Sequence, residues 1–294
     1  HNEIFHDGIN CKPIRLEVNT KMKVPYTRTR AIPISKRQDI ENEINDLLDK
    51  KVIKQATYAP SLTNIVLVKE TRIYQGLPIT KIRFTLDFSH YKNFLKPVRF
   101  PLPNIQNLVS DMTKEKYKLF SSFDMASYFY QFNIDKNTQQ YFGFTTGTKT
   151  YVMCRLIMGI SPSPSIAHAF TEHLCSGLED TKGYLDDVFQ ASENLEQNFK
   201  QAEQFLKRCS TYNVIINPAK VNIAKQSLRC LGYNLANNLV SKSKEKLEKI
   251  SKLEKPRTKD GLKSFLAFCS YFINSSPKIS EKLAPFRIYA KKGK

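Results

Sequence analysis

Two adjacent acidic residues, Asp186 and Asp187, interrupt an otherwise apolar run of strand-forming residues at positions 184–188. An ionised carboxylate is strongly destabilised in apolar surroundings, so the fold must place these acids in a turn, at the surface or beside a cation. Pairs of Asp residues are also common in hairpin turns that have no chemical role. The pair by itself therefore leaves a simple turn and a metal site open.

Length and charge narrow the class of protein. A chain of 294 residues is near the size at which single hydrophobic cores stop growing, so we expect subdomains around a cleft. The 46 Lys and Arg residues against 27 Asp and Glu give a formal net charge of +19, which favours a polyanionic partner, first of all nucleic acid. The six cysteines show no metal-binding spacing and indicate buried thiols in a reducing compartment.

No long apolar run and no apolar amino-terminal segment occurs in the sequence, so we expect a soluble intracellular chain without a membrane partner. Hydrophobic periodicity predicts a mixture of helices and hairpins. Hairpins are expected from residues 64–69 with 81–88 and from 141–144 with 150–153. Helices are expected at about 35–54, with Ile40, Ile44, Leu47 and Leu48 on one face, and at about 104–113, 165–178 and 194–212. Short strands are expected at 214–216 and 231–233, and a Lys-rich helical segment from residue 241 onward.

A third acid, Asp124, ends the apolar run at residues 119–123. An Asp that follows a strand most often caps the next helix. A capping role for Asp124 would not explain why Asp186 and Asp187 lie in an apolar run.

The order of the motifs resembles the reverse transcriptases of gypsy-type LTR retrotransposons and their retroviral relatives. The matching motifs are Phe-Asp-Met around Asp124, Gly-Ile-Ser-Pro-Ser-Pro from Gly159, Tyr-Leu-Asp-Asp from Tyr184, Leu-Gly-Tyr from Leu231 and Leu-Lys-Ser-Phe-Leu from Leu262. They occur in the family's order, and the resemblance extends from about residue 6 to residue 292.

This resemblance implies an α+β fold, namely a right-hand polymerase with fingers, palm and thumb, in which an antiparallel palm sheet packs on helices. The segments expected from it are residues 1–95 (first part of the fingers), 96–131 (first part of the palm), 132–165 (second part of the fingers), 166–236 (second part of the palm) and 237–294 (thumb).

The resemblance also implies RNA- and DNA-templated DNA synthesis, in which dNTPs are added to a primer 3′ end by two-metal nucleotidyl transfer. Asp124, Asp186 and Asp187 are then the catalytic residues and the ligands of two Mg²⁺ (or Mn²⁺) ions. Hard divalent cations prefer such oxygen ligands and neutralise charge on the attacking and leaving oxygens. The family assigns direct metal binding to Asp124 and Asp186 and a more local role to Asp187.

Several residues match the family's nucleotide-binding positions. Phe129, whose position is supported by the nearby Gln131, corresponds to an aromatic side chain that would exclude a ribose 2′-hydroxyl. The expected dNTP-binding residues are Arg83, Lys69, Lys81, Phe129, Met158 and Gly159. Ordinary solvated charge on a hairpin remains the alternative for Arg83 and the lysines, and a place in the hydrophobic core is the alternative for Phe129.

The sequence departs from the family at two positions. Met158 replaces a residue that is often Gln and cannot donate its hydrogen bonds, and Ser89 replaces a common arginine. Lys220 matches a palm lysine that could protonate the departing pyrophosphate, with plain surface charge as the alternative.

The expected contacts to nucleic acid lie in the last third of the chain. Leu231, Gly232 and Tyr233 resemble the primer grip, and a simple β-turn is the alternative. Lys263, Ala267 and Tyr271 recur every four residues on one helix face, which suits a duplex minor groove.

The expected partners are a template–primer duplex of RNA or DNA, dNTPs and other parts of a Pol polyprotein, namely protease, RNase H and integrase. Because the sequence ends just past the thumb region, we expect no RNase H activity of its own. The resemblance implies a location in the cytoplasm, in a virus-like particle, or in the nucleus. The alternatives are a domesticated, non-catalytic nucleic-acid-binding protein and an RNA-dependent RNA polymerase, against which the bulky Phe129 argues.

Overall fold

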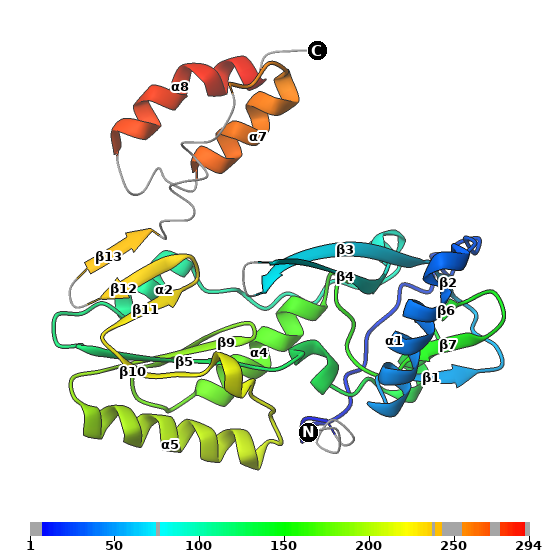
Figure 1. Cartoon of the computed structure of the whole chain (residues 1–294), viewed down its shortest axis with the longest axis horizontal. Coiled ribbons are helices and arrows are strands. Elements are labelled where there is room, and N and C mark those ends of the chain that lie inside the picture. Colours follow the sequence, from blue (N-terminus) through cyan, green and yellow to red (C-terminus); the bar gives the residue numbers. More distant parts are fainter. Residues whose placement is uncertain (1–7, 75–76, 237–238, 243–254, 271–276, 292–294) are drawn as a thin grey trace. The chain divides into compact units, whose positions relative to one another are not determined.

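A computed structural model describes residues 8–74, 77–236, 239–242, 255–270 and 277–291 (Figure 1). The chain forms two compact units. One comprises His1–Cys230 with Leu235–Leu239, and the other comprises Leu231–Asn234 with Val240–Lys294. Among the described helices, none combines the length and the apolar character that crossing a membrane requires.

The first unit contains a four-stranded antiparallel sheet with the strand order β10-β5-β9-β8. Its strands are β5 (Leu119–Asp124), β8 (Thr181–Tyr184), β9 (Asp187–Ser192) and β10 (Asn222–Lys225). The two central strands, β5 and β9, pair along their whole lengths. This central position explains why their residues are mostly buried and why the sequence shows apolar runs there rather than strict alternation.

Two helices cover this sheet. Helix α5 (Leu195–Thr211) packs on β5, β9 and β10, whereas α4 (Ser163–Cys175) packs on β8 (Figure 1). The Asn194 side chain begins α5 by accepting a hydrogen bond from the Gln197 backbone N–H. Phe205 of α5 is fully buried, and its ring lies 4.8 Å from that of Phe123 on β5. Both helices lie within two or three residues of the limits that the sequence predicts.

A second sheet of the same unit has the order β1-β7-β6-β2, in which only the pairing of β2 with β6 is parallel. Its strands are β1 (Ile53–Ala56), β2 (Leu62–Thr63), β6 (Gly143–Thr145) and β7 (Thr150–Met153). Helix α1 (Arg37–Asp49) packs on β1 and buries Ile40, Ile44 and Leu47, the face predicted by the helical spacing. The predicted hairpin of residues 141–144 with 150–153 is confirmed as β6 and β7.

The other predicted hairpin is also confirmed, and it is longer than expected. It consists of β3 (Ile65–Tyr74) and β4 (Leu77–Leu86), which pair from Ile65 with Leu86 to Tyr74 with Leu77. One buried hydrophobic cluster contains residues of both sheets, such as Ile53 of β1 and Val188 of β9. Because they share this core, the two sheets form one packed body.

Short elements connect the sheets, and two of the described helices belong to the second unit. The connecting elements are η2 (Ile34–Lys36), η3 (Ser89–Tyr91), α2 (Ile105–Asp111), η4 (Tyr128–Gln131), α3 (Lys136–Gln139) and η5 (Pro218–Lys220). Three further strands follow, namely β11 (Ser227–Cys230), β12 (Tyr233–Ala236) and β13 (Leu239–Lys242). Strands β11, β12 and β13 form a sheet in that order. The second unit contains α7 (Lys259–Ser270) and α8 (Pro277–Lys291).

Two expected strands take a different form. Leu231 and Gly232 form a turn, with φ angles of 48° and 87° that place both residues in the left-handed region. This conformation suits a tight hairpin connection and favours glycine at the second position. At residues 214–216 the structure shows an isolated bridge between Ile216 and Met125 instead of a strand.

Candidate active site

Three carboxylates lie at one end of the antiparallel sheet. Asp124 is the last residue of β5, Asp187 is the first residue of β9, and the two are direct strand partners. Asp186 precedes Asp187 in the turn that joins β8 to β9. Because antiparallel partners have Cα atoms only about 4.5–5.5 Å apart, the sheet brings together acids that are far apart in the sequence.

Hydrogen bonds from neighbouring segments fix the backbone of these acids. The Met125 backbone N–H donates to the carbonyl oxygen of Asp186 at 2.9 Å, and the Asn217 N–H donates to that of Asp124 at 2.8 Å. Leu185, at the tip of the hairpin, has a left-handed φ of 53°. The backbone geometry around the acids is therefore set by three segments of the chain.

The acids disfavour one another's charge. Burial raises the pKa of Asp187 to about 6, and the negative charges of Asp186 and Asp124 add to this effect. Burial also raises the pKa of Asp186, with a further contribution from Asp124, while Lys220 acts in the opposite direction. A nearby cation would stabilise the charged form of all three groups.

Lys220 brings positive charge to this cluster. It ends η5, whose first turn is capped by the Asn217 side chain, which accepts a hydrogen bond from the Ala219 N–H. The Lys220 Nζ lies 2.8 Å from Oδ2 of Asp124. The lysine side chain is 61% exposed and that of Asp124 is 17% exposed, so the ammonium reaches the carboxylates from the solvent. An exposed pair of this kind contributes at most about 1 kcal/mol to stability.

The set of donor groups is chemically suited to hard divalent cations. Mg²⁺ and Mn²⁺ prefer carboxylate oxygens, and they would relieve the unfavourable charging of Asp186 and Asp187. Within the described residues, no three His, Cys, Asp or Glu side chains are already arranged to hold a metal ion. Because Lys220 pairs with Oδ2 of Asp124, a cation that binds this oxygen would take the place of the ammonium, whereas Oδ1 is the second oxygen of the same carboxylate.

Phe129 lies in η4, the turn that follows Asp124. Its ring is half-buried and packs against the main hydrophobic cluster. Gln131 ends the turn and is buried; its Nε2 donates to the carbonyl oxygens of Ala126 (2.6 Å) and Ile215 (2.9 Å), and its Oε1 accepts from the Ile215 N–H (2.8 Å). Gln131 therefore joins the turn that presents Phe129 to the segment that leads to Lys220. The sequence indicated only that Gln131 supports the position of Phe129.

The basic residues of the long hairpin separate into two sets. Arg83 pairs with Val68 in the hairpin register, and Lys81 pairs with Glu70. Arg83 and Lys81 are two positions apart on β4, so they belong to the same set of every second position along the strand. Lys69, the partner of Ile82, occupies the other set.

Met158 and Gly159 lie in the connection between β7 and α4. Gly159 is exposed and has a φ of 87°, and a Cβ atom there would meet no neighbour, so only the backbone conformation favours glycine. Met158 is half-buried. Ser163 closes the connection, since its hydroxyl donates to the Ile157 carbonyl oxygen at 2.5 Å.

The serine that replaces the family's arginine has a local structural role. The Ser89 hydroxyl donates to Oδ1 of Asp87 at 2.6 Å, and its backbone N–H donates to the same oxygen at 3.1 Å. These two bonds lower the pKa of Asp87. The departure therefore stabilises the turn after β4.

In the second unit, the residues of α7 differ in burial. Lys263 and Ala267 are exposed, and the Lys263 ammonium pairs with Asp260 at 3.2 Å. Leu266 is buried and packs with Leu283 of α8. Tyr271 lies outside the described residues. Leu231 and Gly232 lie in the turn described above, and Tyr233 is the first residue of β12.

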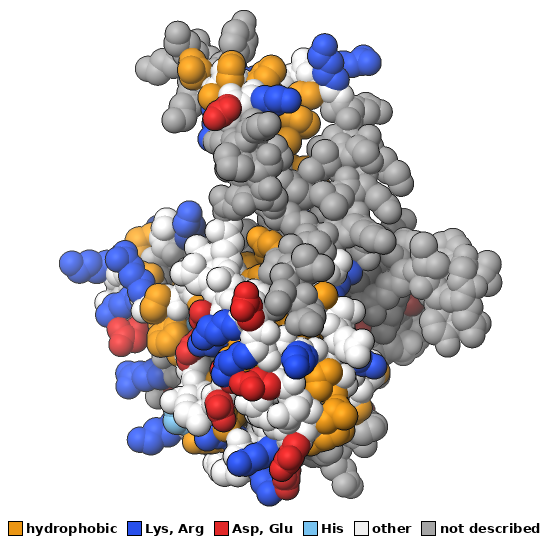
Figure 2. Space-filling model, turned by 90° about the vertical axis from the view of Figure 1, so that its left-hand side faces the viewer, with side chains coloured by type: hydrophobic (Ala, Val, Ile, Leu, Met, Phe, Trp, Pro, Cys, Tyr) orange, Lys and Arg blue, Asp and Glu red, His pale blue; other side chains and the backbone are white. Residues whose placement is uncertain are grey.

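The positive charge of the chain is dispersed on the face that Figure 2 shows. Among the side chains described there, Lys and Arg are interspersed with acidic and hydrophobic ones and do not merge into one basic patch. The net charge of +19 therefore does not by itself define a nucleic-acid surface on this face.

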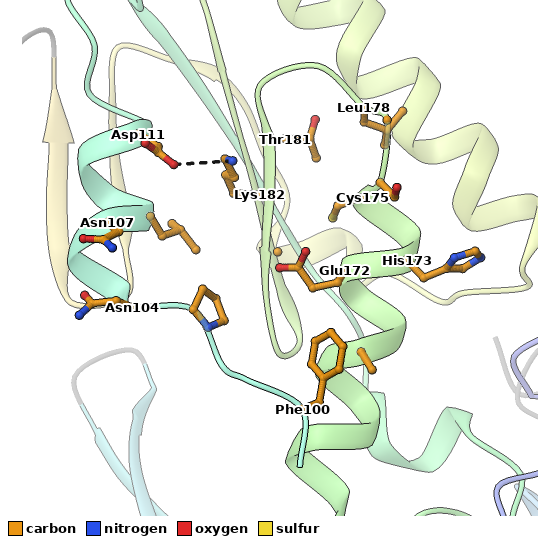
Figure 3. Close-up of a pocket in the computed structure, with 16 residues that line it drawn as sticks. Phe100, Asn104, Asn107, Asp111, Glu172, His173, Cys175, Leu178, Thr181 and Lys182 are labelled. Atoms are coloured by element: carbon orange, nitrogen blue, oxygen red, sulfur yellow. Dashed lines mark ion pairs between the residues drawn. The ribbon is translucent and has the colours of Figure 1, made fainter. Parts of the chain in front are cut away.

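A cavity of about 750 Å³ lies between α2, the carboxyl-terminal half of α4 and β8 (Figure 3). Asp111 of α2 faces Lys182 of β8 across it, and the two side chains pair at 3.6 Å. The catalytic candidates Asp124, Asp186 and Asp187 are absent from its lining. The carboxylate cluster is therefore a separate site.

Two residues that contact the hairpin were missed by the sequence analysis. His168 and Thr171 of α4 are fully buried and bind the backbone of Leu185. Their signal in the sequence is weak: they are polar residues on the same helix face as the buried Ala167 and Leu174.

Comparison with known proteins identifies relatives over most of the chain. Residues 69–235 match the family model described as reverse transcriptase (RNA-dependent DNA polymerase). The Retrovirus-related Pol polyprotein from transposon 412 of Drosophila melanogaster is 22% identical over 84% of this chain and 20% of its own length. The corresponding polyprotein from transposon opus is 24% identical over 92% of this chain and 27% of its length. The chain thus spans about a fifth to a quarter of these relatives.

Solved structures confirm the predicted fold. The foamy viral protease-reverse transcriptase dRH in complex with double-stranded DNA matches 99% of this chain and 50% of its own, with a TM-score of 0.85 and 22% identity. The foamy viral protease-reverse transcriptase in complex with an RNA/DNA hybrid matches 98% of this chain and 37% of its own, with a TM-score of 0.79 and 21% identity. The expected α+β right-hand polymerase architecture is therefore correct.

Proposed function

The chain belongs to the reverse transcriptase (RNA-dependent DNA polymerase) family, and from this premise we propose that it adds dNTPs to a primer 3′ end on RNA and DNA templates. The observation that carries the proposal is the pairing of Asp124 with Asp187, beside Asp186, at the end of the sheet. Carboxylates gathered in this way, with raised pKa values for Asp186 and Asp187, are typical of a catalytic cation site.

Asp124, Asp186 and Asp187 would hold two divalent ions, Mg²⁺ or Mn²⁺, which supply charge neutralisation at the attacking and leaving oxygens when bound. The residues of the chain provide the rest of the site. The backbone hydrogen bonds to Asp124 and Asp186 keep the carboxylates at the sheet end. Lys220, held at Asp124 in this structure, would turn to the departing pyrophosphate and donate a proton from Nζ.

Recognition of the nucleotide would depend on residues other than the three acids. Phe129, fixed by the turn that Gln131 anchors, would lie under the nucleotide sugar and exclude a 2′-hydroxyl. Arg83 and Lys81, on one set of hairpin positions, would bind the triphosphate. Lys69, on the other set, together with Met158 and Gly159, completes the proposed nucleotide-binding residues.

The template–primer duplex would be bound at the turn of Leu231, Gly232 and Tyr233 and at the exposed Lys263 and Ala267 of α7. We propose that the chain is the polymerase module of a gypsy-type Pol polyprotein and that protease, RNase H and integrase are its partners there. The transposon polyproteins that it resembles support this assignment. The proposed location is the cytoplasm, in a virus-like particle.

Primer extension tests this proposal. The purified chain should extend a DNA primer on RNA and DNA templates with dNTPs and Mg²⁺ or Mn²⁺, and Asp186→Asn should abolish extension while primer–template affinity stays within about threefold, because cationic residues supply most binding. Binding without any extension would instead identify a non-catalytic nucleic-acid-binding protein. Comparing dNTP with rNTP incorporation separates the chain from an RNA-dependent RNA polymerase, and equal use of both would refute the assignment of Phe129 as the residue that excludes a 2′-hydroxyl.

A further inference from the structure

Helix α4 binds the hairpin tip immediately before the catalytic acids. Leu185 has a left-handed φ of 53°, which costs a non-glycine residue about 1–2 kcal/mol. Its carbonyl oxygen accepts a hydrogen bond from the Thr171 hydroxyl at 2.6 Å, and its N–H donates to Nδ1 of His168 at 3.4 Å. Both polar backbone groups of a strained residue are thus held by α4, as expected where a site depends on that conformation.

A second hydroxyl extends this contact to the turn that carries Phe129. The Tyr128 hydroxyl lies 2.8 Å from Oγ1 of Thr171, and both residues are buried. Both hydroxyls also lie near the Ala167 carbonyl oxygen, that of Thr171 at 3.1 Å and that of Tyr128 at 3.2 Å. Because the Leu185 carbonyl oxygen, at 2.6 Å, is the nearer acceptor for the one hydroxyl proton of Thr171, we assign Tyr128 as the donor to Thr171. Burial raises the pKa of Tyr128, so this donor stays protonated. The resulting relay runs from Tyr128 through Thr171 to Leu185 and joins segments on both sides of the acids.

Close packing fixes the distance between α4 and the hairpin. A Cβ atom on Gly183 of β8 would lie 2.4 Å from the Thr171 methyl carbon and 3.2 Å from the Cys175 sulfur. Figure 3 shows this part of β8 directly beside α4. The backbone of β8 can therefore approach the helix closely, which brings the Leu185 carbonyl within reach of Thr171.

We propose that Thr171 and Tyr128 are positioning residues, whose hydroxyl relay fixes Asp186 relative to the turn that presents Phe129. This inference rests on the proposed polymerase function. Its consequence is that loss of one buried hydroxyl slows the chemical step, because small displacements of a metal ligand reduce the rate strongly.

Three variants distinguish the contribution of the hydroxyl groups to the rate from that of side-chain packing. Thr171→Val keeps the shape of the side chain and removes the hydroxyl; Thr171→Ser keeps the hydroxyl and removes the methyl group; Tyr128→Phe removes only the second donor. In single-turnover extension we expect Thr171→Val to lower the rate of nucleotide addition about tenfold, with KM for dNTP and primer–template affinity within about twofold. Thr171→Ser should retain most of the rate.

Coupling between the two hydroxyls is the second expectation. Tyr128→Phe should slow addition less than Thr171→Val, and the double variant should be no slower than Thr171→Val alone, because the relay is already broken. Thr211→Val is the matched control, since Thr211 donates to the carbonyl four residues earlier on the exposed part of α5. It should leave the rate unchanged.

Two kinetic results would overturn the inference: a wild-type rate in Thr171→Val, or equal losses in Thr171→Val and Thr171→Ser. Hydrogen–deuterium exchange provides a readout that does not need catalysis. Amides at residues 184–188 should exchange faster in Thr171→Val than in Thr171→Ser or wild type. If the wild type does not extend primers but this exchange difference is present, the proposed function fails and the positioning contact stands; equal exchange in all three proteins refutes the contact.

Discussion

The ammonium of Lys220 lies 2.8 Å from Oδ2 of Asp124, although 96 positions separate the two residues in the chain. Asp124 lies beside Asp187 in the sheet, so this contact brings a proton donor to the same place as the acids. A single exposed ion pair contributes little to stability. The role of Lys220 is therefore best tested by the rate of nucleotide addition rather than by protein stability.

Replacing Lys220 should affect the rate more than binding. Lys220→Gln removes the donor, and we expect nucleotide addition to slow by about 10- to 100-fold or more, with primer–template affinity within about threefold. Single-turnover extension measures the rate. Lys225→Gln, an exposed lysine of β10, is the control; equal effects of the two variants would assign Lys220 to plain surface charge.

The stability of the metal-free protein should fall as pH rises. The pKa of Asp187 is raised to about 6, above the unfolded value of about 3.9, so the folded state binds the proton more tightly. Its favourable contribution is complete below about pH 4 and is lost as pH rises through 6. Urea unfolding between pH 4 and 7 in EDTA measures this change.

Two further results test the assignment to Asp187. Asp187→Asn should reduce the pH slope, whereas Asp39→Asn, on an exposed part of α1, should keep it. Mg²⁺ should stabilise the wild type at pH 7 and have little effect at pH 4. An unchanged slope in Asp187→Asn would show that other groups cause the pH dependence.

Phe129 should control the choice of sugar. Phe129→Val opens space beneath the sugar, and we expect discrimination between dNTP and rNTP, measured as the ratio of kcat/KM values, to fall by about 10- to 100-fold, which corresponds to about 1.4–2.7 kcal/mol. Phe129→Tyr keeps the ring and should keep the discrimination. Unchanged discrimination in Phe129→Val would show that another residue excludes the 2′-hydroxyl.

Gln131 should be a major contributor to stability. Gln131→Ala leaves the Ile215 N–H and the Ala126 and Ile215 carbonyl oxygens without their side-chain partner, and we expect a loss of roughly 2–3 kcal/mol in urea unfolding. Gln140→Ala provides the comparison, because the exposed Gln140 donates to the Asn137 carbonyl oxygen; its effect should stay below about 0.5 kcal/mol. Similar losses in both would contradict the bridging role.

A methyl group on Gly183 should displace the catalytic hairpin. Its Cβ would lie 2.4 Å from the Thr171 methyl carbon, so we expect Gly183→Ala to lower the rate of extension at least about tenfold through a small displacement of the acids. Adding Thr171→Ser removes that methyl carbon and should restore part of the rate. A double variant as slow as Gly183→Ala would place the clash elsewhere.

Local patterns were sufficient for many elements of the fold. The helical spacing of Ile40, Ile44 and Leu47 predicted the buried face of α1, and the strand-forming runs at residues 141–144 and 150–153 predicted the hairpin of β6 and β7. These features depend on periodicity and turn chemistry over a few residues. Left-handed conformations at Leu185 and Leu231 were not predicted, because residues other than glycine seldom adopt them without tertiary contacts.

By itself, the sequence determined the order of the motifs, the family that they resemble and the residue types that carry the chemistry. Only the tertiary structure decided which of them meet: Asp124 with Asp187, Lys220 with Asp124, and Tyr128 with Thr171. The physical reason is that these contacts join distant segments, whose register is fixed by packing of the whole sheet and its helices. Burial of the hydrophobic residues sets the register of a whole strand at the same time. A pattern of a few neighbouring residues does not show which residue of another strand lies opposite.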